Sequence, residues 1–194
     1  MKINLLHTKT MIAAIRMIIT CLMLLCNFTL LSQNVFENYA NIESFQCNFV
    51  EDKMMKSLNE SFISEGTIKY TQTEIIFEYT KPEHIVIRKN ADDIITVSKN
   101  DKSIKTNMFH KQTISFVENI LKGNIANLTD NYQIVTTDDA DQNIVGLTAK
   151  KKSRVETVEL YFDKSDSNVI NKIIVRETKG NVTTITVSDL KIIM

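Results

Sequence analysis

The chain has 194 residues, and its 23 Lys and Arg residues balance 23 Asp and Glu residues. That length predicts one domain with a sizeable core. The first 32 residues carry three basic side chains and no acidic one, so the remainder has a net charge of −3, which argues against a nucleic-acid-binding protein because that class concentrates basic residues on one face.

Residues 1–32 have the form of a secretory signal peptide. Their three basic side chains precede a mostly apolar run of 15 residues, Met17–Leu31. Ser32, which follows the run, is a small residue that suits a cleavage site. The run is short for a membrane-spanning helix, which needs about 20 apolar residues. We therefore expect a cleaved signal and a single exported domain over residues 33–194, with a retained membrane anchor as the alternative.

A short helix, Val35–Ile42, and six strands are predicted for the first half of the exported part. The helix has apolar residues at helical spacing, whereas each strand alternates apolar with polar residues. Gly66 lies inside one strand pattern, which predicts a bulge or a bend. The expected strands are Ser44–Lys53, Leu58–Tyr70, a strand through Ile75, Phe77 and Tyr79 that stops at Pro82, His84–Lys89, Ile94–Ser98 and Ser103–Thr106.

Two polar turns, Asn90-Ala91-Asp92 and Lys99-Asn100-Asp101, separate the last three of these strands. Asn and Asp tolerate the left-handed backbone of tight turns, so they can replace glycine there. Cys47 would be the one cysteine left after cleavage, which rules out an internal disulfide. Because it alternates with Phe45 and Phe49, we expect it to be a small buried apolar residue.

The second half is predicted to contain one amphipathic helix and five longer strands. Met108–Lys122 has an apolar helical face and is followed by Gly123 as a C-cap, so the helix is expected to lie over the sheet. Turns are expected at Asp138–Gln142, Lys164–Ser167 and Lys179-Gly180-Asn181. This order of elements predicts an α+β fold with antiparallel meanders. The five strands are Tyr132–Thr137, Asn143–Lys150, Val155–Asp163, Val169–Glu177 and Val182–Ile193.

No arrangement of residues in the sequence predicts catalysis or metal binding. His84 and His110 lack a nearby Cys or carboxylate at metal-ligand spacing. There is no Gly-x-Ser-x-Gly elbow and no glycine-rich phosphate loop. The acidic run Asp138–Asp141 lacks the Gly and Glu of a calcium loop. We therefore expect no enzyme, no catalytic residue, no metal and no cofactor.

Large apolar side chains on about eleven strands and one helix must share the interior. A sheet with that many strands tends to curl or close, and a helix over its mouth could then enclose an apolar cavity. A plainly packed core explains the same composition, so both interpretations stay open at this point.

The segment Gly66-Thr-Ile-Lys-Tyr, followed by Phe77-Glu-Tyr-Thr-Lys-Pro82, resembles the LolA family of periplasmic carriers, which move lipoproteins between the two membranes of diderm bacteria. Phe45–Phe49 is similar to the first strand of that family, and Val155–Phe162, Val169–Glu177 and Asn181–Val187 are similar to its last three. The likeness covers most of Asn34–Met194.

The resemblance implies an incomplete antiparallel β-barrel of about 11 strands, with helices covering its open side and a cavity for acyl chains. It also implies a monomeric periplasmic carrier without catalysis or cofactor. Its partners would be acylated lipoproteins, an inner-membrane lipoprotein-releasing transporter and an outer-membrane acceptor. Many members hold the lid shut with an Arg beside a strand turn, whereas this chain has Thr71-Gln72-Thr73 there, and Phe77 stands in place of the usual Trp.

The residues expected to line the acyl-chain cavity are those that share the inward direction of the strands and of the helix. For each of them, core packing is an equally good explanation. They are Phe45, Phe49, Phe62, Ile68, Tyr70, Ile75, Phe77, Tyr79, Ile85 and Ile87 from the strands, with Phe109, Phe116, Val117 and Ile120 from the helix.

Two other functions fit the same shape. A lipid- or lipoprotein-sensing regulatory module of the cell envelope would bind the same ligand without transporting it, and it would need a retained anchor at Met17–Leu31 or a second domain. A structural adaptor would bind a protein partner, and its own side chains would fill the interior.

Overall fold

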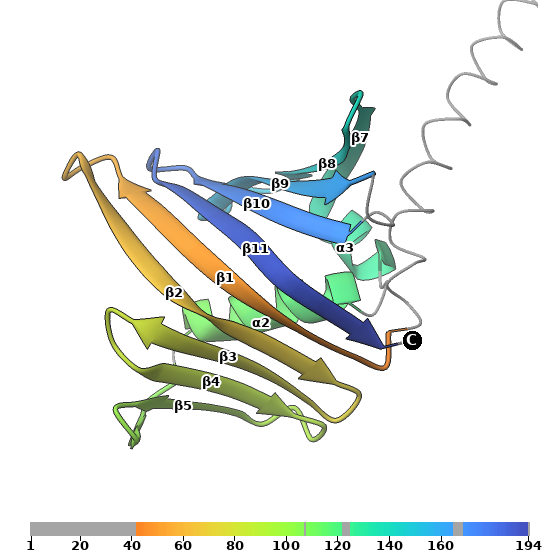
Figure 1. The fold of residues 1–194 in the computed structure, drawn as a ribbon. Helices are drawn as coiled ribbons and strands as arrows, with labels where there is room; N and C mark the ends of the chain where they lie inside the picture. The colour runs from red at the N-terminus through yellow and green to blue at the C-terminus, as the bar shows by residue number, and fades with distance from the viewer. Residues whose placement is uncertain (1–41, 107, 122–124, 165–168, 194) are drawn as a thin grey trace, which may run out of the picture.

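The computed structural model describes residues 42–106, 108–121, 125–164 and 169–193. They form one sheet of eleven strands and two helices (Figure 1). The strands of the first half are β1 (Ser44–Met55), β2 (Glu60–Thr71), β3 (Glu74–Lys81), β4 (Ile85–Asn90), β5 (Ile95–Lys99) and β6 (Lys102–Ile104). The helices are α2 (Met108–Leu121) and α3 (Ile125–Asn131), and β7 (Tyr132–Asp138), β8 (Gln142–Ala149), β9 (Val155–Asp163), β10 (Val169–Glu177) and β11 (Val182–Ile193) follow.

The sheet is antiparallel throughout and open. Its strand order is β6-β5-β4-β3-β2-β1-β11-β10-β9-β8-β7, so the chain starts in the middle, runs to one edge and returns from the other. The first strand β1 pairs with the last strand β11, with Ser44 opposite Ile193 and Met54 opposite Val182. The expected eleven strands and unclosed antiparallel sheet are therefore confirmed.

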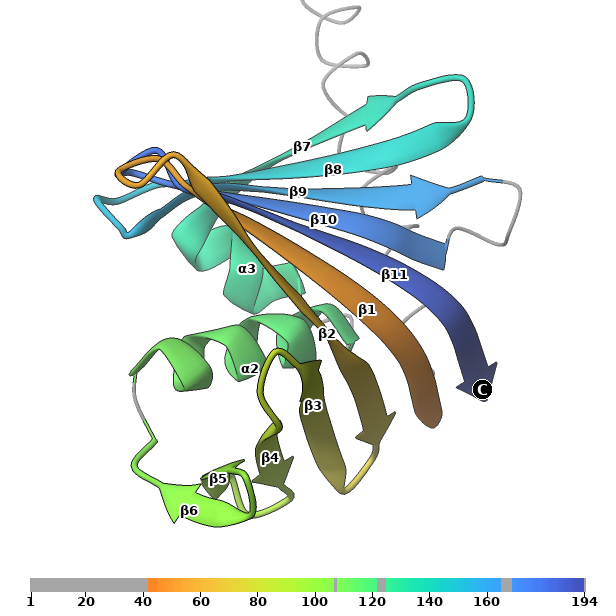
Figure 2. The ribbon, with the colours of Figure 1, turned by 60° about the vertical axis from the view of Figure 1, so that its left-hand side comes forward.

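The two helices connect the opposite edges of this sheet. Strand β6 ends at Ile104 on one edge and β7 begins at Tyr132 on the other, so the chain between them has to cross the molecule. Figure 2 shows the sheet curving strongly and both helices lying on its concave side. Neither described helix is of a length and apolarity that could span a bilayer.

The core lies between the concave face and the helices. Ile114 of α2 and Leu128 of α3 belong to the same buried cluster as the inward residues of the strands. On the second half of the sheet, the fully buried members are Val145, Leu147, Leu160 and Phe162. Alternation along β8 and β9 thus directs one face of each strand inward.

Asn and Asp replace glycine in the turns, as expected. Strands β5 and β6 are joined by a two-residue loop, because Lys99 pairs with Lys102, and Asn100 and Asp101 both have positive φ angles of 47° and 63°. Two positive φ angles are the signature of a type I′ hairpin turn. In the preceding turn the residue with positive φ is Asp93, one position after the predicted triplet.

Gly66 lies at the expected bulge. The pairing of β2 with β3 shifts between Glu65 and Gly66. A Cβ atom on Gly66 would lie 2.2 Å from the carbonyl oxygen of Glu78 and 2.7 Å from Cζ of Phe49. Only glycine fits there, because the Phe49 ring and the β3 backbone occupy the space of a side chain.

Several strand boundaries differ from the sequence-based expectation by one or two residues, and one helix was not expected. Strand β2 begins at Glu60, because Leu58 and Asn59 form the turn with β1, and β6 ends at Ile104 instead of Thr106. Helix α3 was not predicted, since its seven residues include two Asn, Thr and Asp, which have low helix propensity. The signal peptide, residues 35–41 of the first predicted helix, Gly123 and most of the Lys164–Ser167 turn lie outside the described residues.

Candidate functional site

Strands β1 to β4 form an apolar wall on the concave face. Alternate residues of β1 point inward, and the pairing places each beside an inward residue of the next strand. Phe45 lies opposite Tyr70, and Ile68 lies opposite Phe77, which in turn faces Ile87. This register makes one continuous apolar surface across four strands.

Aromatic pairs strengthen this wall at two points. The rings of Phe45 and Tyr70 are stacked with centroids 5.8 Å apart, and those of Phe49 and Tyr79 meet edge to face at 5.1 Å. Such pairs add about 0.5–1.5 kcal/mol beyond the area that they bury. The wall is therefore a rigid surface in which Gly66 leaves room for the Phe49 ring.

Helix α2 faces the wall from the opposite side. Ile114 is completely buried, and Phe116 and Val117 pack against the buried cluster. The Phe116 ring also contacts the Tyr132 ring of β7 edge to face, with centroids 6.4 Å apart. The helix thus contacts both the buried cluster and the edge strand β7.

Most of the residues expected to line a cavity share this interior. The buried ones are Phe45, Phe49, Ile68, Tyr70, Ile75, Phe77 and Ile87, and the partly buried ones are Tyr79, Ile85, Phe116 and Val117. Phe62 differs: its side chain is 47% exposed near the end of the β1–β2 hairpin. The side chains of Phe109 and Ile120 lie outside those that the structure describes.

The sequence-based set missed the second half of the interior. Val145, Leu147, Val158, Leu160 and Phe162 are as deeply buried as the residues of β1 to β4. Their segments, Asn143–Lys150 and Val155–Asp163, were predicted as strands, but their inward residues were not included in the site. The same period-two pattern would have identified them.

One carboxyl group lies on the inner wall. Glu51 is half-buried on the face that carries Phe49, and the Tyr79 hydroxyl donates a hydrogen bond of 3.2 Å to its Oε2. Burial raises the pKa of Glu51, against the opposing effects of Tyr79 and Lys53. Burial and the Glu51 carboxylate together raise the pKa of Tyr79 as well. Glu51 is therefore a polar point of the wall at which a hydrogen-bonding group of a ligand could be held.

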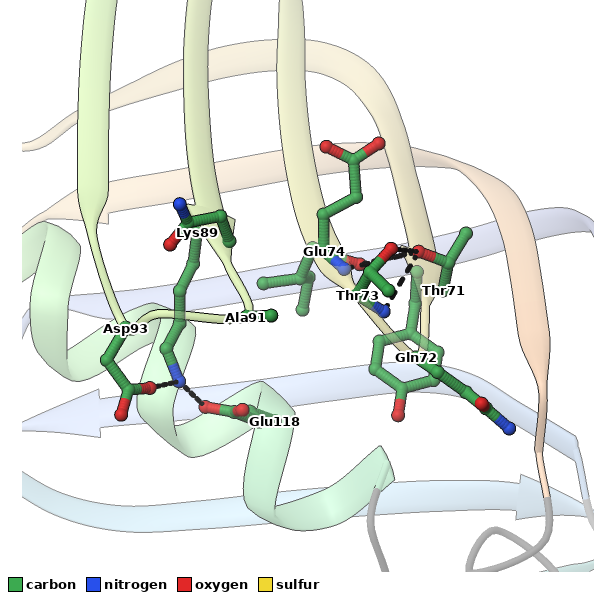
Figure 3. Close-up of a pocket in the computed structure, with 11 residues that line it drawn as sticks. Thr71, Gln72, Thr73, Glu74, Lys89, Ala91, Asp93 and Glu118 are labelled. Carbon is green, nitrogen blue, oxygen red and sulfur yellow. Dashed lines mark hydrogen bonds and ion pairs between the residues drawn. The ribbon is translucent and has the colours of Figure 1, made fainter.

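A cavity of about 210 Å³ opens between α2 and the turns at one end of β2 to β5. Figure 3 shows its lining, which includes Tyr70 and Ile75 from the wall, the turn residues Thr71 to Glu74, and Lys89. Thr71 Oγ1 accepts hydrogen bonds from the backbone N–H groups of Thr73 and Glu74 and so holds that turn.

Lys89 joins the sheet to the helix inside this cavity. It follows Ile85 and Ile87 on the inward side of β4 and is only 9% exposed. Its ammonium group forms ion pairs with Glu118 of α2 and with Asp93 at 2.7 Å. Burial alone would lower the pKa of Lys89, but the two carboxylates outweigh it and raise this pKa.

The Lys89 ion pair was missed by sequence reasoning, although a signal for it exists. A charged residue on the apolar face of a strand is unusual unless it has a buried partner. The turn Thr71-Gln72-Thr73, where a cation was expected by resemblance but is missing, also lines this cavity. The cation that reaches helix α2 is instead Lys89 of β4.

The described residues hold no group of three or more His, Cys, Asp and Glu side chains that could bind a metal ion. Cys47 is a buried free thiol, and burial raises its pKa to about 11. Within the described part, the chemistry of the site is therefore that of an apolar interior with a few paired polar groups.

A family model described as outer membrane lipoprotein carrier protein LolA matches residues 40–193. No curated protein matches the chain.

Several solved structures resemble the chain at low identity. A LolA superfamily protein from Nitrosomonas europaea is 16% identical, with a TM-score of 0.44, over 84% of this chain and 93% of that one. The lipoprotein LppX from Mycobacterium tuberculosis is 10% identical, with a TM-score of 0.43, over 82% and 94%. An outer membrane lipoprotein-sorting protein domain from Vibrio parahaemolyticus is 8% identical, with a TM-score of 0.37, over 82% and 91%. These scores are below 0.5, so the family match alone connects the chain to known proteins.

Proposed function

Because the chain belongs to the LolA family of outer membrane lipoprotein carrier proteins, we propose that it binds the acyl chains of lipoproteins and carries them from the inner to the outer membrane. The acyl chains occupy the space between the apolar wall of β1 to β4 and helix α2, which covers the open side of the sheet. The protein performs no catalysis and uses no cofactor.

The observation that supports this proposal most strongly is the continuous apolar surface on the concave face, opposed by a helix whose Ile114, Phe116 and Val117 side chains pack against the buried cluster. Exposing an acyl chain of about fifteen methylenes to water costs roughly 0.8 kcal/mol of free energy per methylene, so the chain cannot cross an aqueous compartment unshielded. Many weak apolar contacts can hide such a chain and still release it.

The cavity beside Lys89 indicates how loading would proceed. Its volume of about 210 Å³ is below the roughly 300–1,000 Å³ of typical small-molecule sites. A lipoprotein therefore needs α2 to move away from the wall. Lys89 and Glu118 fasten that helix in the closed state, in the role that an Arg has in many members of the family.

The site of action is the periplasm, which the protein reaches through a cleaved signal peptide. A monomer would receive its cargo from an inner-membrane lipoprotein-releasing transporter and pass it to an outer-membrane acceptor. This part of the proposal rests on the membership in the family.

Native mass spectrometry of the exported protein, purified from an envelope extract without detergent, tests the function. Co-purification of acylated protein supports the carrier. Bound free lipid without any acylated protein would instead favour the lipid-sensing module, and a protein that takes up neither would favour the adaptor.

Two variants on α2 test whether lipoprotein binds in the interior beside this helix. Val117 packs against the buried cluster, whereas Ser115 is exposed on the same helix. Val117→Asn places an amide against the apolar chains and should lower the amount of retained lipoprotein severalfold. Ser115→Asn adds the same amide to the outer surface and should leave it unchanged. Equal retention by both folded variants would contradict binding beside α2.

A further inference from the structure

Three hairpin turns lie together at one end of the sheet. They join β1 to β2, β8 to β9, and β10 to β11, and the antiparallel strand order places all three at the same end. Figure 2 shows the three turns converging at the left of the view, with the β1–β2 hairpin among them. Together these three turns form the hairpin end.

A buried carboxylate connects the three turns. Glu177 is 6% exposed and accepts hydrogen bonds from Arg154 Nη2 at 3.1 Å and from Asn181 Nδ2 at 3.0 Å. Lys53 Nζ lies 3.9 Å from its Oε1. The backbone N–H of Lys56 donates to Asn181 Oδ1 at 3.2 Å. The hairpin end is therefore a fixed surface whose parts keep their relative positions.

Basic residues concentrate at this end. The three turns, each with two flanking residues on either side, span residues 54–61, 148–156 and 176–183. They hold seven of the 23 Lys and Arg residues of the chain but only three of its 23 Asp and Glu residues. One of these three acids is Glu177, whose charge is already offset by Arg154 and Lys53. A chain with no net charge thus carries a positive end.

Large apolar side chains are exposed beside this charge. Leu58 in the β1–β2 turn is 55% exposed, and Met54, Phe62 and Ile63 behind it are 41%, 47% and 59% exposed. Phe62 pairs with Lys53 and lies two positions after Glu60, the first residue of β2, which places it about 7 Å from the turn. An interfacial segment inserts its apolar side chains about 5–10 Å into a bilayer, so the hairpin has the appropriate reach.

We propose that the hairpin end docks on the surface of a bilayer that contains anionic phospholipid. The β1–β2 hairpin inserts Leu58, Phe62 and neighbouring apolar side chains, while Lys150, Lys151 and Lys152 of the exposed β8–β9 turn contact the lipid phosphates. The charge identifies the partner: exposed apolar residues alone would fit many surfaces, but with an excess of lysine they fit an anionic interface. This docking needs no lipoprotein in the interior, so it stands apart from the carrier proposal.

Vesicle flotation tests the docking with the processed, exported protein, whose N-terminus is verified by mass spectrometry. The probes are vesicles of phosphatidylcholine alone and of phosphatidylcholine with 30% phosphatidylglycerol, at low salt and at about 0.5 M NaCl, where screening shortens the reach of charges to a few ångström. We expect binding to the anionic vesicles at low salt, with at least a fivefold loss at high salt or without phosphatidylglycerol.

Variants separate the two parts of the surface. Replacing the three lysines at 150–152 by Gln should weaken binding about fivefold per residue. Leu58→Ser with Phe62→Ser should weaken it by a similar overall factor without changing the salt dependence. Lys69→Gln with Lys191→Gln and Val135→Ser change exposed residues elsewhere and serve as controls.

Three results would overturn the docking proposal. They are equal binding to neutral and anionic vesicles, equal losses in the control variants, and no binding to either vesicle. The last result would assign the basic end to an acidic protein surface. Because vesicle binding is measured separately from co-purified acylated protein, failure of the docking proposal can be distinguished from failure of the carrier proposal.

Discussion

Lys89 of β4 and Glu118 of α2 form an ion pair that joins the sheet to the helix crossing its concave side. The two residues are 29 positions apart in the chain, and both line the same cavity. Asp93 shares the ammonium group, so the helix and the β4–β5 turn are fixed by one cation.

Lys89→Met should loosen α2. The change removes the Lys89 ammonium group from the partly buried Glu118 carboxylate and should lower the free energy of unfolding by about 2 kcal/mol. Hydrogen exchange should become faster in α2 before it changes in β8 and β9. The exchanged pair Lys89→Glu with Glu118→Lys should recover part of the loss. Unchanged exchange in α2 would show that packing alone holds the helix.

Gly66→Ala should destabilise the sheet. The new methyl group would meet the Glu78 carbonyl and the Phe49 ring, neither of which can move without disturbing β3 or the wall. Overpacking of this kind costs about 1–3 kcal/mol, measured by urea unfolding. Gly146→Ala is the control, because its Cβ would lie 3.6 Å from the nearest atom, the Val135 carbonyl oxygen. That change should stabilise the strand by about 0.5 kcal/mol.

Stability should depend on pH through Glu177. Burial favours its neutral form, but Arg154, Asn181 and Lys53 outweigh burial and lower the pKa of Glu177. Its contribution is therefore complete above the ordinary glutamate range, near pH 4.5, and is lost as the pH falls through the lowered pKa. Glu177→Gln should lower the free energy of unfolding by about 1–3 kcal/mol at pH 7, and this difference from the unchanged protein should shrink toward zero in strong acid.

Thermal unfolding at pH 7 and near pH 2 measures this effect. Glu156→Gln on the neighbouring strand β9 changes an exposed carboxyl and should have little effect at either pH. A difference between Glu177→Gln and the unchanged protein that stays constant with pH would argue against ionisation as its cause.

Cys47 should report on opening of the interior. Its side chain is 2% exposed, and burial raises the pKa of the thiol to about 11, so the reactive thiolate is scarce at pH 8. The processed protein should react with a thiol reagent at least a hundredfold more slowly than the protein unfolded in urea. Lys89→Met should accelerate this reaction if release of α2 uncovers the wall, and Ser115→Asn should not.

Local patterns predicted most of the secondary structure, because alternation depends only on neighbouring residues. Val155–Asp163, Val169–Glu177 and Val182–Ile193 have the predicted bounds, and the Asn and Asp turns occur where glycine is missing. Helix α3 was not predicted because it has only seven residues, four of them of low helix propensity, and so short a helix forms only against a neighbour such as the core around Leu128.

The sequence by itself determined which residues alternate along the strands, that the fold is an antiparallel sheet with a helix between its two halves, and which family it resembles. Only the tertiary structure decided that Lys89 reaches Glu118, that β8 and β9 complete the interior, and that three basic turns meet around Glu177. The physical reason is that pairing between β1 and β11 brings together residues about 140 positions apart, and no local pattern encodes such a distance.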